Sequence, residues 1–309
     1  MPEGYIPGYS KRVPGQRRPT LDRIYPDGRI RAVVNRIIPF SSVDGPGNRT
    51  AVFFQGCNIN CRYCHNPETR AMCAGCGTCV RNCPEGALAF GSGGQILYYP
   101  EKCVQCDTCI HVCPHDSSPR TQVMTPDDVE EKVRKQIPFI RGISVSGGEC
   151  MLRPAFLTEL FRLAKADGLG TLIDSNGTIP CWEYPKLMDV SDGVMLDIKA
   201  FDTRDHEHVT GSPNDIVLEN AVWLAGHSKL YEVRAVIVPD LYDGEKSVRG
   251  IAEYLAPYLS INDIRIKVIA YRPMGVREEY SHYQVPTQDY LSYLADIFHE
   301  HGFSHVTII

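Results

Sequence analysis

From residue 140 onward, short apolar runs alternate with longer amphipathic stretches. The short runs are rich in β-branched residues and, with an earlier one, predict buried strands at 50–54, 143–146, 171–174, 194–199, 233–238 and 264–270. Apolar positions at helical spacing predict helices at 155–166, 215–226, 247–258 and 288–301, before a last strand at 305–309. This alternation indicates a parallel sheet covered by helices. Its six units are fewer than the eight of a closed TIM barrel, so we expect an α/β fold, a partial (β/α)6 TIM-type barrel.

Two parts of the chain depart from this pattern. Residues 1–29 are rich in Pro, Gly and Arg and lack periodicity, which predicts a poorly ordered basic tail. Residues 67–120 have few long apolar runs and contain a duplication, in which 73–84 repeats as 103–114. The predicted domains are the tail (1–29), the barrel (30–66, with a further strand candidate at 30–38, and 121–309) and an inserted domain (67–120).

Composition and charge narrow the function classes. Apolar residues make up 43% of the 309 residues and charged residues 22%, a balance typical of a folded globular protein. The formal net charge is −5, although residues 1–36 carry a net of +5. Because the acidic remainder would repel phosphate, we expect no nucleic-acid partner. The chain lacks both a run of ~20 apolar residues and an apolar core typical of a signal peptide, which predicts a cytoplasmic protein without a membrane partner.

The cysteines indicate bound metal. Eleven of the thirteen lie between Cys57 and Cys113, and clustered cysteines in a reducing cytosol favour metal ligands over disulfides. Two runs within 67–120 have the spacing C-x2-C-x2-C-x3-C-P of ferredoxins that hold two [4Fe-4S] clusters. Zinc is the alternative, but zinc sites use two separated pairs rather than tandem runs. Because the fourth cysteine of each run ligates the other cluster, cluster A is assigned Cys73, Cys76, Cys79 and Cys113, and cluster B Cys103, Cys106, Cys109 and Cys83.

A third cysteine group has a different spacing. Cys57, Cys61 and Cys64 form C-x3-C-x2-C, and no fourth barrel cysteine lies nearby in sequence. Three thiolates on a four-iron cluster leave one iron with an open coordination position, which distinguishes a reactive metal from a structural one. Cys61 to His65 also fits C-x-x-C-H, the attachment motif of c-type haem. Haem attachment requires export and leaves Cys57 unexplained, so we expect a third [4Fe-4S] cluster here.

Residues 57–64, with Tyr63 before the last cysteine, resemble the signature of radical S-adenosylmethionine (SAM) enzymes. Three motifs resemble those of glycyl-radical-enzyme activating enzymes, the pyruvate formate-lyase activase family: Asp44-Gly45-Pro46-Gly47, Cys64-His65-Asn66-Pro67 and Ser146-Gly147-Gly148-Glu149. The inserted ferredoxin-like domain is similar to that of the larger activases. Three further motifs look closest to the subgroup called YjjW: Ile38-Pro39-Phe40-Ser41, Asp174-Ser175-Asn176-Gly177 and Cys106-Asp107-Thr108-Cys109.

The resemblance implies how SAM is held. Its methionine chelates the open iron, the glycine turn binds its ammonium group, and Lys199 of Asp197-Ile198-Lys199 meets its carboxylate. The implied SAM contacts are Tyr63, Cys64, His65, Gly147, Gly148, Glu149, Asp174, Asp197, Ile198, Lys199, Arg234 and Arg272. Arg272 departs from the family, which presents a His there. Three of these contacts have a purely structural alternative. The glycine turn could be an ordinary turn, Asp174 a helix N-cap, and Arg234 an exposed strand residue.

Two further roles follow from the resemblance. Asp174, Ser175 and Asp197 are implied ligands of a monovalent cation beside the SAM carboxylate. Asp44 is implied to contact a peptide substrate, and its Asp-Gly-Pro-Gly sequence predicts a β-turn in either case.

The implied function is activation of a partner glycyl radical enzyme under anaerobic conditions. A flavodoxin or ferredoxin-like donor supplies electrons, SAM is cleaved reductively to a 5′-deoxyadenosyl radical, and that radical abstracts a hydrogen from a glycine α-carbon. Clusters A and B either relay electrons or stabilise the fold. The alternatives are another radical SAM enzyme acting on a small molecule or modifying a peptide, a non-catalytic electron carrier, and a scaffold bound through the basic tail.

Overall fold

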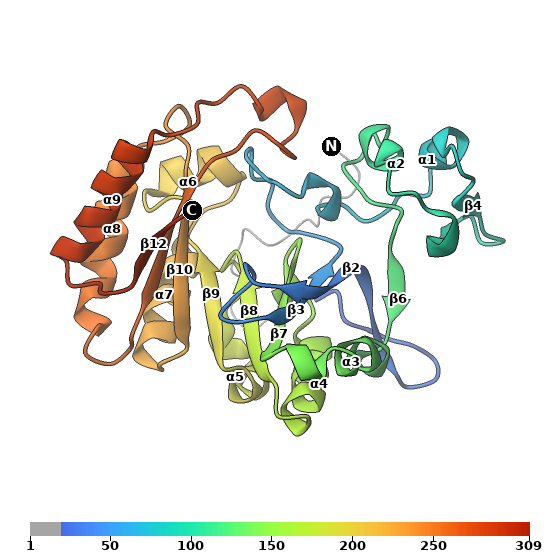
Figure 1. Ribbon diagram of the computed structural model, residues 1–309, viewed down its shortest axis with the longest axis horizontal. Helices are drawn as coiled ribbons and strands as arrows, with labels where there is room; N and C mark the ends of the chain where they lie inside the picture. Colours follow the sequence, from blue (N-terminus) through green and yellow to red (C-terminus); the bar gives the residue numbers. More distant parts are fainter. Residues whose placement is uncertain (1–19) are drawn as a thin grey trace.

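The computed structural model describes residues 20–309, so residues 1–19 of the predicted tail lie outside the described range. A mixed ten-stranded sheet dominates it, with the strand order β1-β2-β3-β7-β8-β9-β10-β11-β12 and with β6 paired to β2 (Figure 1). Neighbouring strands are parallel from β3 to β12 along this path, whereas β2 is antiparallel to β1, β3 and β6. The strands are β1 (Arg23–Ile24), β2 (Ile30–Ser41), β3 (Arg49–Phe54), β6 (Gln122–Met124), β7 (Gly142–Gly147), β8 (Gly170–Ser175), β9 (Gly193–Asp197), β10 (Leu230–Ile237), β11 (Arg265–Ala270) and β12 (Val306–Ile308).

The predicted strands match this sheet closely. The six units correspond to β3 and β7 to β11, and the predicted last strand is β12, a further parallel strand. The strand predicted at 194–199 ends earlier, at Asp197, so Lys199 lies in the loop that follows it. This mixed α/β sheet is consistent with the predicted partial barrel.

Helices connect the parallel strands. The four predicted helices appear as α4 (Pro154–Ala166), α7 (Asp215–Gly226), α8 (Gly244–Leu255) and α9 (Gln288–Glu300). Three further helices were not predicted: α3 (Pro126–Arg134), α5 (Pro185–Val190) and α6 (Thr203–Thr210). Helix α3 had a local signal, because Thr125 and Asp128 form a reciprocal capping box at its start. No helix within residues 20–309 is long and apolar enough to cross a bilayer.

The two faces of the parallel strands differ in polarity. Alternate side chains such as Val145, Ile173 and Val233 are fully buried in one apolar core with the helices. On the opposite face, several positions are polar: Ser144, Ser146, Asp174, Asp197, Glu232, Arg234 and Lys267. A closed TIM barrel fills its interior with branched apolar side chains. The inner wall of this sheet is instead suited to a polar ligand.

Residues 20–29 are ordered, so the prediction of a poorly ordered tail is wrong for this part. Strand β1 pairs with the start of β2, and the Leu21 amide donates to the Leu152 carbonyl at 2.6 Å. The Asp22 carboxylate accepts hydrogen bonds from the backbone amides of Ala155 and Phe156 at 2.9 and 3.1 Å. Asp22, which is distant in sequence, therefore caps the N-terminus of α4. The helix's own N-cap residue, Arg153, makes no side-chain capping hydrogen bond.

Replacing Asp22 with Ala should destabilise the fold. Two amide groups in the first turn of α4 lose their acceptor, and losing such a cap costs about 1 kcal/mol. Urea unfolding followed by circular dichroism would measure the loss. Asp22→Asn keeps an acceptor oxygen and serves as the control; equal losses in both variants would contradict the capping role.

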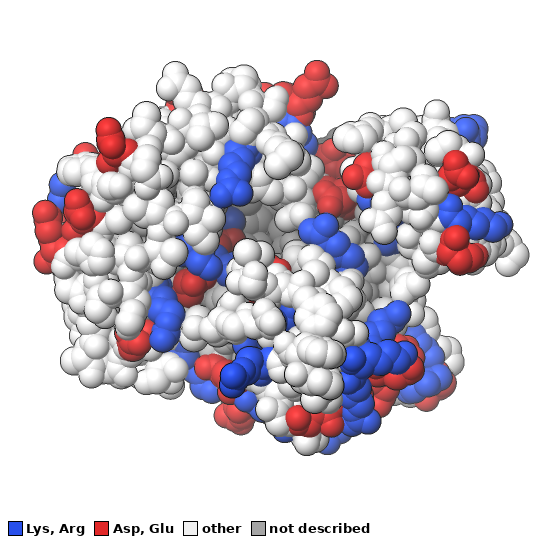
Figure 2. Space-filling model, viewed as in Figure 1, with Lys and Arg blue, Asp and Glu red and all other residues white. Residues whose placement is uncertain are grey.

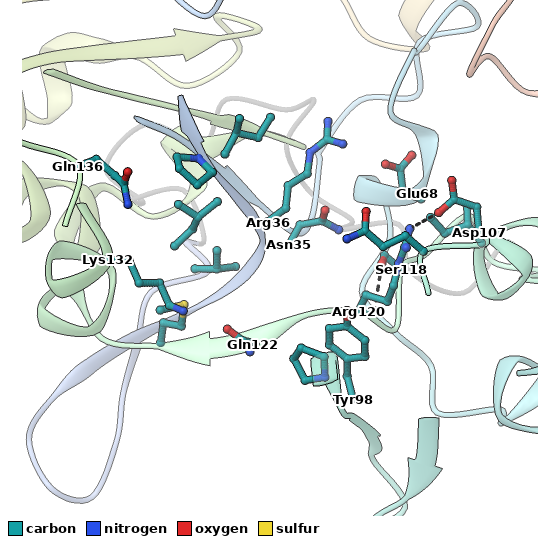
Figure 3. Close-up of a pocket in the computed structure, with 18 of the residues that line it drawn as sticks. Asn35, Arg36, Glu68, Tyr98, Asp107, Ser118, Arg120, Gln122, Lys132 and Gln136 are labelled. Carbon is teal, nitrogen blue, oxygen red and sulfur yellow. Dashed lines mark hydrogen bonds and ion pairs between the residues drawn. The ribbon is translucent and has the colours of Figure 1, made fainter. Parts of the chain in front are cut away.

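After the loop that carries Cys57, Cys61 and Cys64, the residues that lead to β6 form a lobe beside the sheet (Figure 1). It contains the hairpin β4 (Leu88–Phe90) and β5 (Ile96–Tyr98) and the short helices α1 (Thr78–Asn82) and α2 (Thr108–His111). The duplication is visible in the backbone, because the residue before each helix, Gly77 or Asp107, has a positive φ. Figure 2 shows a hollow between the barrel and this lobe, and Figure 3 shows the groove that β2, β6, α3 and the lobe line together.

Candidate active site

A cavity of about 260 Å³ lies at the carboxyl ends of β7 to β11, where parallel barrels place their chemistry. Twelve residues singled out from the sequence line it: Cys57, Cys61, Tyr63, Cys64, His65, Gly147, Gly148, Asp174, Ser175, Asp197, Lys199 and Arg234. Val236 and Ile269 add an apolar wall. Glu149, Ile198, Arg272 and Asp44 do not line this cavity.

The three cysteines lie on one loop that the surrounding structure holds at several points. The amides of Asn60 and Arg62 donate to carbonyls at the end of α6, at 2.9 Å each, and the Cys57 amide donates to the Arg70 carbonyl at 2.8 Å. Arg277 donates from Nη2 to the Cys61 carbonyl at 3.0 Å. The loop is therefore fixed by backbone contacts, which leaves the three thiols available as ligands.

The chemistry of this donor set fits an iron–sulfur cluster. Burial raises the pKa of all three thiols, that of Cys61 to about 12, so a metal is needed to hold them as thiolates. Among residues 20–309, no three Cys, His, Asp or Glu side chains converge at the distances of a single metal ion. Cys57, Cys61 and Cys64 line one cavity of about 260 Å³, and three thiolates at one site suit a multi-iron group.

The glycine turn after β7 approaches the cavity because it has no side chains. Gly147 has a φ of +119°, and a Cβ there would lie 2.2 Å from the Phe54 amide nitrogen. A Cβ on Gly148 would lie 2.2 Å from the Gly56 carbonyl oxygen. Only glycine fits at either position, and the turn thereby brings polar backbone groups against the cysteine loop.

Glu149 faces away from the cavity. Its carboxylate accepts hydrogen bonds from the Met151 amide (2.9 Å), the Ser175 hydroxyl (2.9 Å) and the Asn176 amide (2.7 Å). The structure therefore does not bring the implied SAM contact of this side chain into the cavity. Glu149 instead positions the turn after β8.

The buried Glu149 should make stability depend on pH. Burial raises its pKa from 4.5 to about 7. Its contribution to stability is fully present below pH 4.5 and is lost as the pH rises through 7, because ionising the buried carboxyl costs more than ionising the exposed one. The whole effect is on the order of 3 kcal/mol.

Urea unfolding at pH 5 and pH 8 would test this prediction. In Glu149→Gln the unfolding free energy should fall less between pH 5 and pH 8 than in wild type. Glu183→Gln, at an exposed position, should keep the wild-type slope of unfolding free energy against pH. An unchanged slope in Glu149→Gln would refute the assignment.

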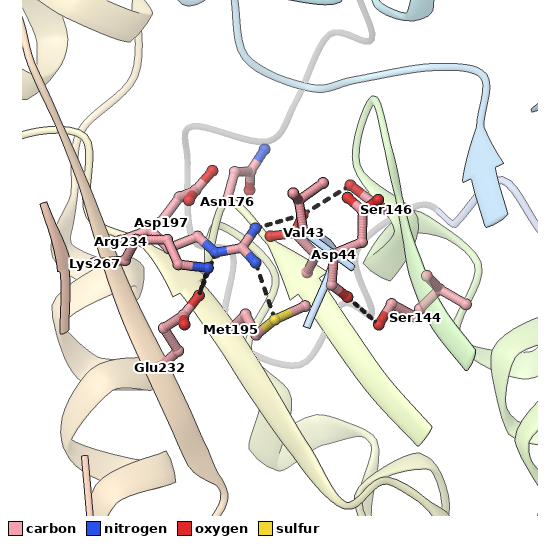
Figure 4. A network of polar contacts seen from close by, with 12 residues as sticks. Val43, Asp44, Ser144, Ser146, Asn176, Met195, Asp197, Glu232, Arg234 and Lys267 are labelled. Atoms are coloured by element: carbon pink, nitrogen blue, oxygen red, sulfur yellow. Dashed lines mark hydrogen bonds and ion pairs between the residues drawn. The ribbon is translucent and has the colours of Figure 1, made fainter. Parts of the chain in front are cut away.

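Charged side chains on the inner wall form a connected network (Figure 4). Arg234 lies 3.0 Å from the Asp174 carboxylate and donates from Nε to Glu232 at 2.6 Å. Lys267 adds a second ion pair to Glu232, at 3.2 Å. Arg234 is only 10% exposed, so the alternative of an exposed strand position does not apply to it.

A separate ion pair lies in the loop after β9. Lys199 donates from Nζ to the Asp197 carboxylate at 2.6 Å, and its ammonium group lies 5.7 Å from the centre of the Tyr63 ring. Both carboxylates of the implied cation site thus have a basic partner, and the Ser175 hydroxyl is bound to Glu149. The monovalent cation at Asp174, Ser175 and Asp197 stays a prediction.

Three other implied site residues lie outside the cavity. The Arg272 side chain is exposed, and its carbonyl oxygen lies 2.9 Å from His65 Nε2. Ile198 is buried, and its amide donates to the Arg234 carbonyl at 3.1 Å. Asp44 lies on a turn that reaches the inner wall, where the Ser144 hydroxyl donates to its carbonyl oxygen (Figure 4).

Two residues of the site were not predicted from the sequence. Asn176 lines the cavity and directs Nδ2 toward the Cys57 sulfur at 3.7 Å. Its motif was noted, but its role depends on a cysteine 119 positions away. Arg277 holds the cysteine loop and lies 3.7 Å from Asp116 in the lobe, and no local motif marks it.

Residues 51–255 match the Radical SAM superfamily. The indoleacetate decarboxylase activating enzyme of Tractidigestivibacter scatoligenes is 30% identical, over 89% of this chain and 97% of its own. The pyruvate formate-lyase-activating enzyme of Streptococcus mutans is 31% identical, over 80% of each chain. The chain belongs to the glycyl-radical-enzyme activating enzymes of the radical SAM superfamily.

The fold agrees with this membership. A radical SAM methyltransferase from Sphaerobacter thermophilus covers 94% of this activating enzyme and 76% of its own chain, with a TM-score of 0.51 and 13% identity. At that identity the likeness concerns the fold alone.

Proposed function

We propose that this chain activates a partner glycyl radical enzyme by radical SAM chemistry. The observation that carries the proposal is the convergence of three thiols, a glycine turn and the Asp197–Lys199 pair on one cavity at the carboxyl ends of the strands. A non-catalytic electron carrier or a scaffold would not need that convergence.

Each part of the cavity has a distinct task. Cys57, Cys61 and Cys64 hold a [4Fe-4S] cluster that, with SAM, supplies a 5′-deoxyadenosyl radical when both are bound. The backbone of the glycine turn and the Lys199 ammonium bind and orient the charged end of SAM. Val236 and Ile269 exclude water and competing hydrogen donors from this wall.

A protein loop is the proposed substrate. The sheet path ends at β1 and β12 without closing, and its inner wall carries fixed charges that suit a polypeptide backbone. The turn with Asp44 reaches that wall, which supports a contact with the substrate glycine loop. The experiment below also tests the alternative function, another radical SAM reaction. Membership of the YjjW subgroup stays a prediction.

The lobe is proposed to be a ferredoxin-like domain (67–120) with two further clusters. In support, one small pocket is lined by Cys83 from the first repeat and Cys103, Cys106 and Cys109 from the second, the crossed set assigned to cluster B. Cys113 lies near enough to the first-repeat thiols Cys73 and Cys79 to raise the pKa of both, although Cys109 of the cluster B set also raises that of Cys79.

Contacts between the lobe and the cysteine loop support an electron relay to the cavity. Asp116 in the lobe pairs with Arg70 at 2.7 Å, and the Arg70 carbonyl accepts the Cys57 amide. Arg277 joins Asp116 to the Cys61 carbonyl. The proposed source is a flavodoxin or ferredoxin-like donor in an anaerobic cytoplasm.

Anaerobic reconstitution with iron, sulfide, SAM and reductant tests the proposal. Electron paramagnetic resonance should show a glycyl radical on the correct partner, with 5′-deoxyadenosine as coproduct. Cleavage of SAM without a glycyl radical on any candidate partner would favour the alternative reaction, and no cleavage would refute the enzyme. A Cys76→Ala/Cys106→Ala variant that remained fully active with every reductant would refute the relay.

A further inference from the structure

The groove between the barrel and the lobe has a volume of about 820 Å³ and carries positive charge (Figure 3). Four basic residues line it against two acidic ones, a net charge of +2 in a chain of net charge −5. The basic residues are Arg36, Arg120, Lys132 and Lys135, and the acidic residues are Glu68 and Asp107. They come from β2, α3 and its C-cap, the lobe and the segments that join the lobe to the barrel.

Two of these cations have no carboxylate within ion-pair distance among residues 20–309. Arg36 donates to the Asn66 side chain at 3.0 Å and lies over the Phe53 ring at 4.5 Å, and Lys132 has no ion pair with any residue that the structure describes. Arg120 and Lys135, by contrast, pair with Asp107 and Glu131. Within the described part of the chain, Arg36 and Lys132 are therefore the cations of the groove that no ion pair holds, and the carboxylate of the groove without an ion pair, Glu68, is attracted by Arg36 and Arg120.

The groove adjoins one cysteine set directly. Tyr98, Asp107 and Arg120 line both the groove and the small pocket formed by Cys83, Cys103, Cys106 and Cys109. A second groove of about 830 Å³ includes Cys73 of the other set, but its two basic and two acidic residues leave it without net charge. Both grooves share Lys132 and Lys135, so the difference in net charge comes from the other charged residues: Arg36, Arg120, Glu68 and Asp107 beside cluster B, and Asp128 and Glu131 beside cluster A.

We infer that the positive groove is the docking site of an acidic electron-carrier protein, which delivers electrons to the iron–sulfur cluster held by Cys83, Cys103, Cys106 and Cys109. Each transfer moves one electron from carrier to cluster, so that the carrier is oxidised and the cluster reduced, without proton transfer. Opposite charges steer such partners together and fix their orientation. The inference rests on the proposed function, because it requires the two clusters of the lobe.

Charge reversal in the groove tests the docking site. The reconstituted Arg36→Glu/Lys132→Glu variant should be reduced by flavodoxin hydroquinone, used as the probe, about 10-fold or more slowly than wild type at low ionic strength. Stopped-flow bleaching of cluster absorbance gives the rate, and titration with oxidised flavodoxin gives the dissociation constant. The reduction rate and the dissociation constant should both depend much less on salt concentration in the variant than in wild type.

Three controls make the result decisive. The Lys186→Glu/Arg204→Glu variant changes the charge equally at exposed positions outside the groove. Reduced methyl viologen, a cation, should reduce the groove variant no more slowly than wild type, which shows that its clusters are intact. Lys132→Glu alone should show a smaller effect of the same sign and leaves the Arg36–Asn66 contact in place.

Equal slowing in both double variants, or none in either, would overturn the docking site. If methyl viologen reduces the clusters and SAM is cleaved, that result leaves the proposed function standing. If the wild-type lobe holds no cluster, the docking site and the relay fail together, while SAM cleavage at the other cluster is still measurable.

Discussion

The Cys61→Ala variant is expected to form no 5′-deoxyadenosine above background after anaerobic reconstitution. Cys61 is 8% exposed and lines the cavity with Cys57 and Cys64, and two cysteines are too few to hold a four-iron cluster with one open corner. Liquid chromatography would measure the product. Electron paramagnetic resonance of the reduced protein would show whether only this cluster is missing.

A matched variant separates loss of a ligand from loss of a buried thiol. Cys181 is 2% exposed, lies in the apolar core and lines none of the cavities described above. Cys181→Ala should therefore keep SAM cleavage, with only a modest fall in unfolding free energy. Substantial cleavage by Cys61→Ala, or equal losses in both variants, would contradict a cluster at this loop.

The sequence predicted those parts of the fold that depend on local pattern. Alternating apolar runs located β3 and β7 to β12 because each strand buries one face against helices. The order at 20–29 was missed because the partners of Asp22 lie 133 and 134 positions away, on a helix whose N-terminus it caps. A tail rich in Pro and Arg gives no sign of such a contact.

In the site, too, local sequence features were predicted and contacts between distant residues were not. Cysteine spacing and the glycine turn are local features, and the structure brings both to one cavity. Glu149 shares a motif with Gly147 and Gly148, yet its carboxylate accepts hydrogen bonds from Ser175 and Asn176, which lie 26 and 27 positions away. Arg277 is 216 positions from Cys61, so only the folded chain reveals that contact.

The Lys199→Met variant should weaken SAM binding by roughly 30-fold or more. Lys199 is 13% exposed and bonds to Asp197, and truncating one partner of a buried charge pair costs about 2–5 kcal/mol. The substitution has two consequences: the unpaired Asp197 lowers the unfolding free energy, and under the proposed function the cavity loses the ammonium group that binds the SAM carboxylate. Equilibrium dialysis with the reconstituted protein gives the dissociation constant, and Lys186→Met at an exposed position is the control.

A double variant separates these two consequences. In Asp197→Asn/Lys199→Met the unpaired carboxylate is gone, so the unfolding free energy should recover relative to Lys199→Met. SAM affinity should stay low, because the neutral pair still lacks the cation that a carboxylate ligand needs. If affinity recovered together with stability, Lys199 would act only as the structural partner of Asp197, and the assignment of the SAM carboxylate to it would be wrong.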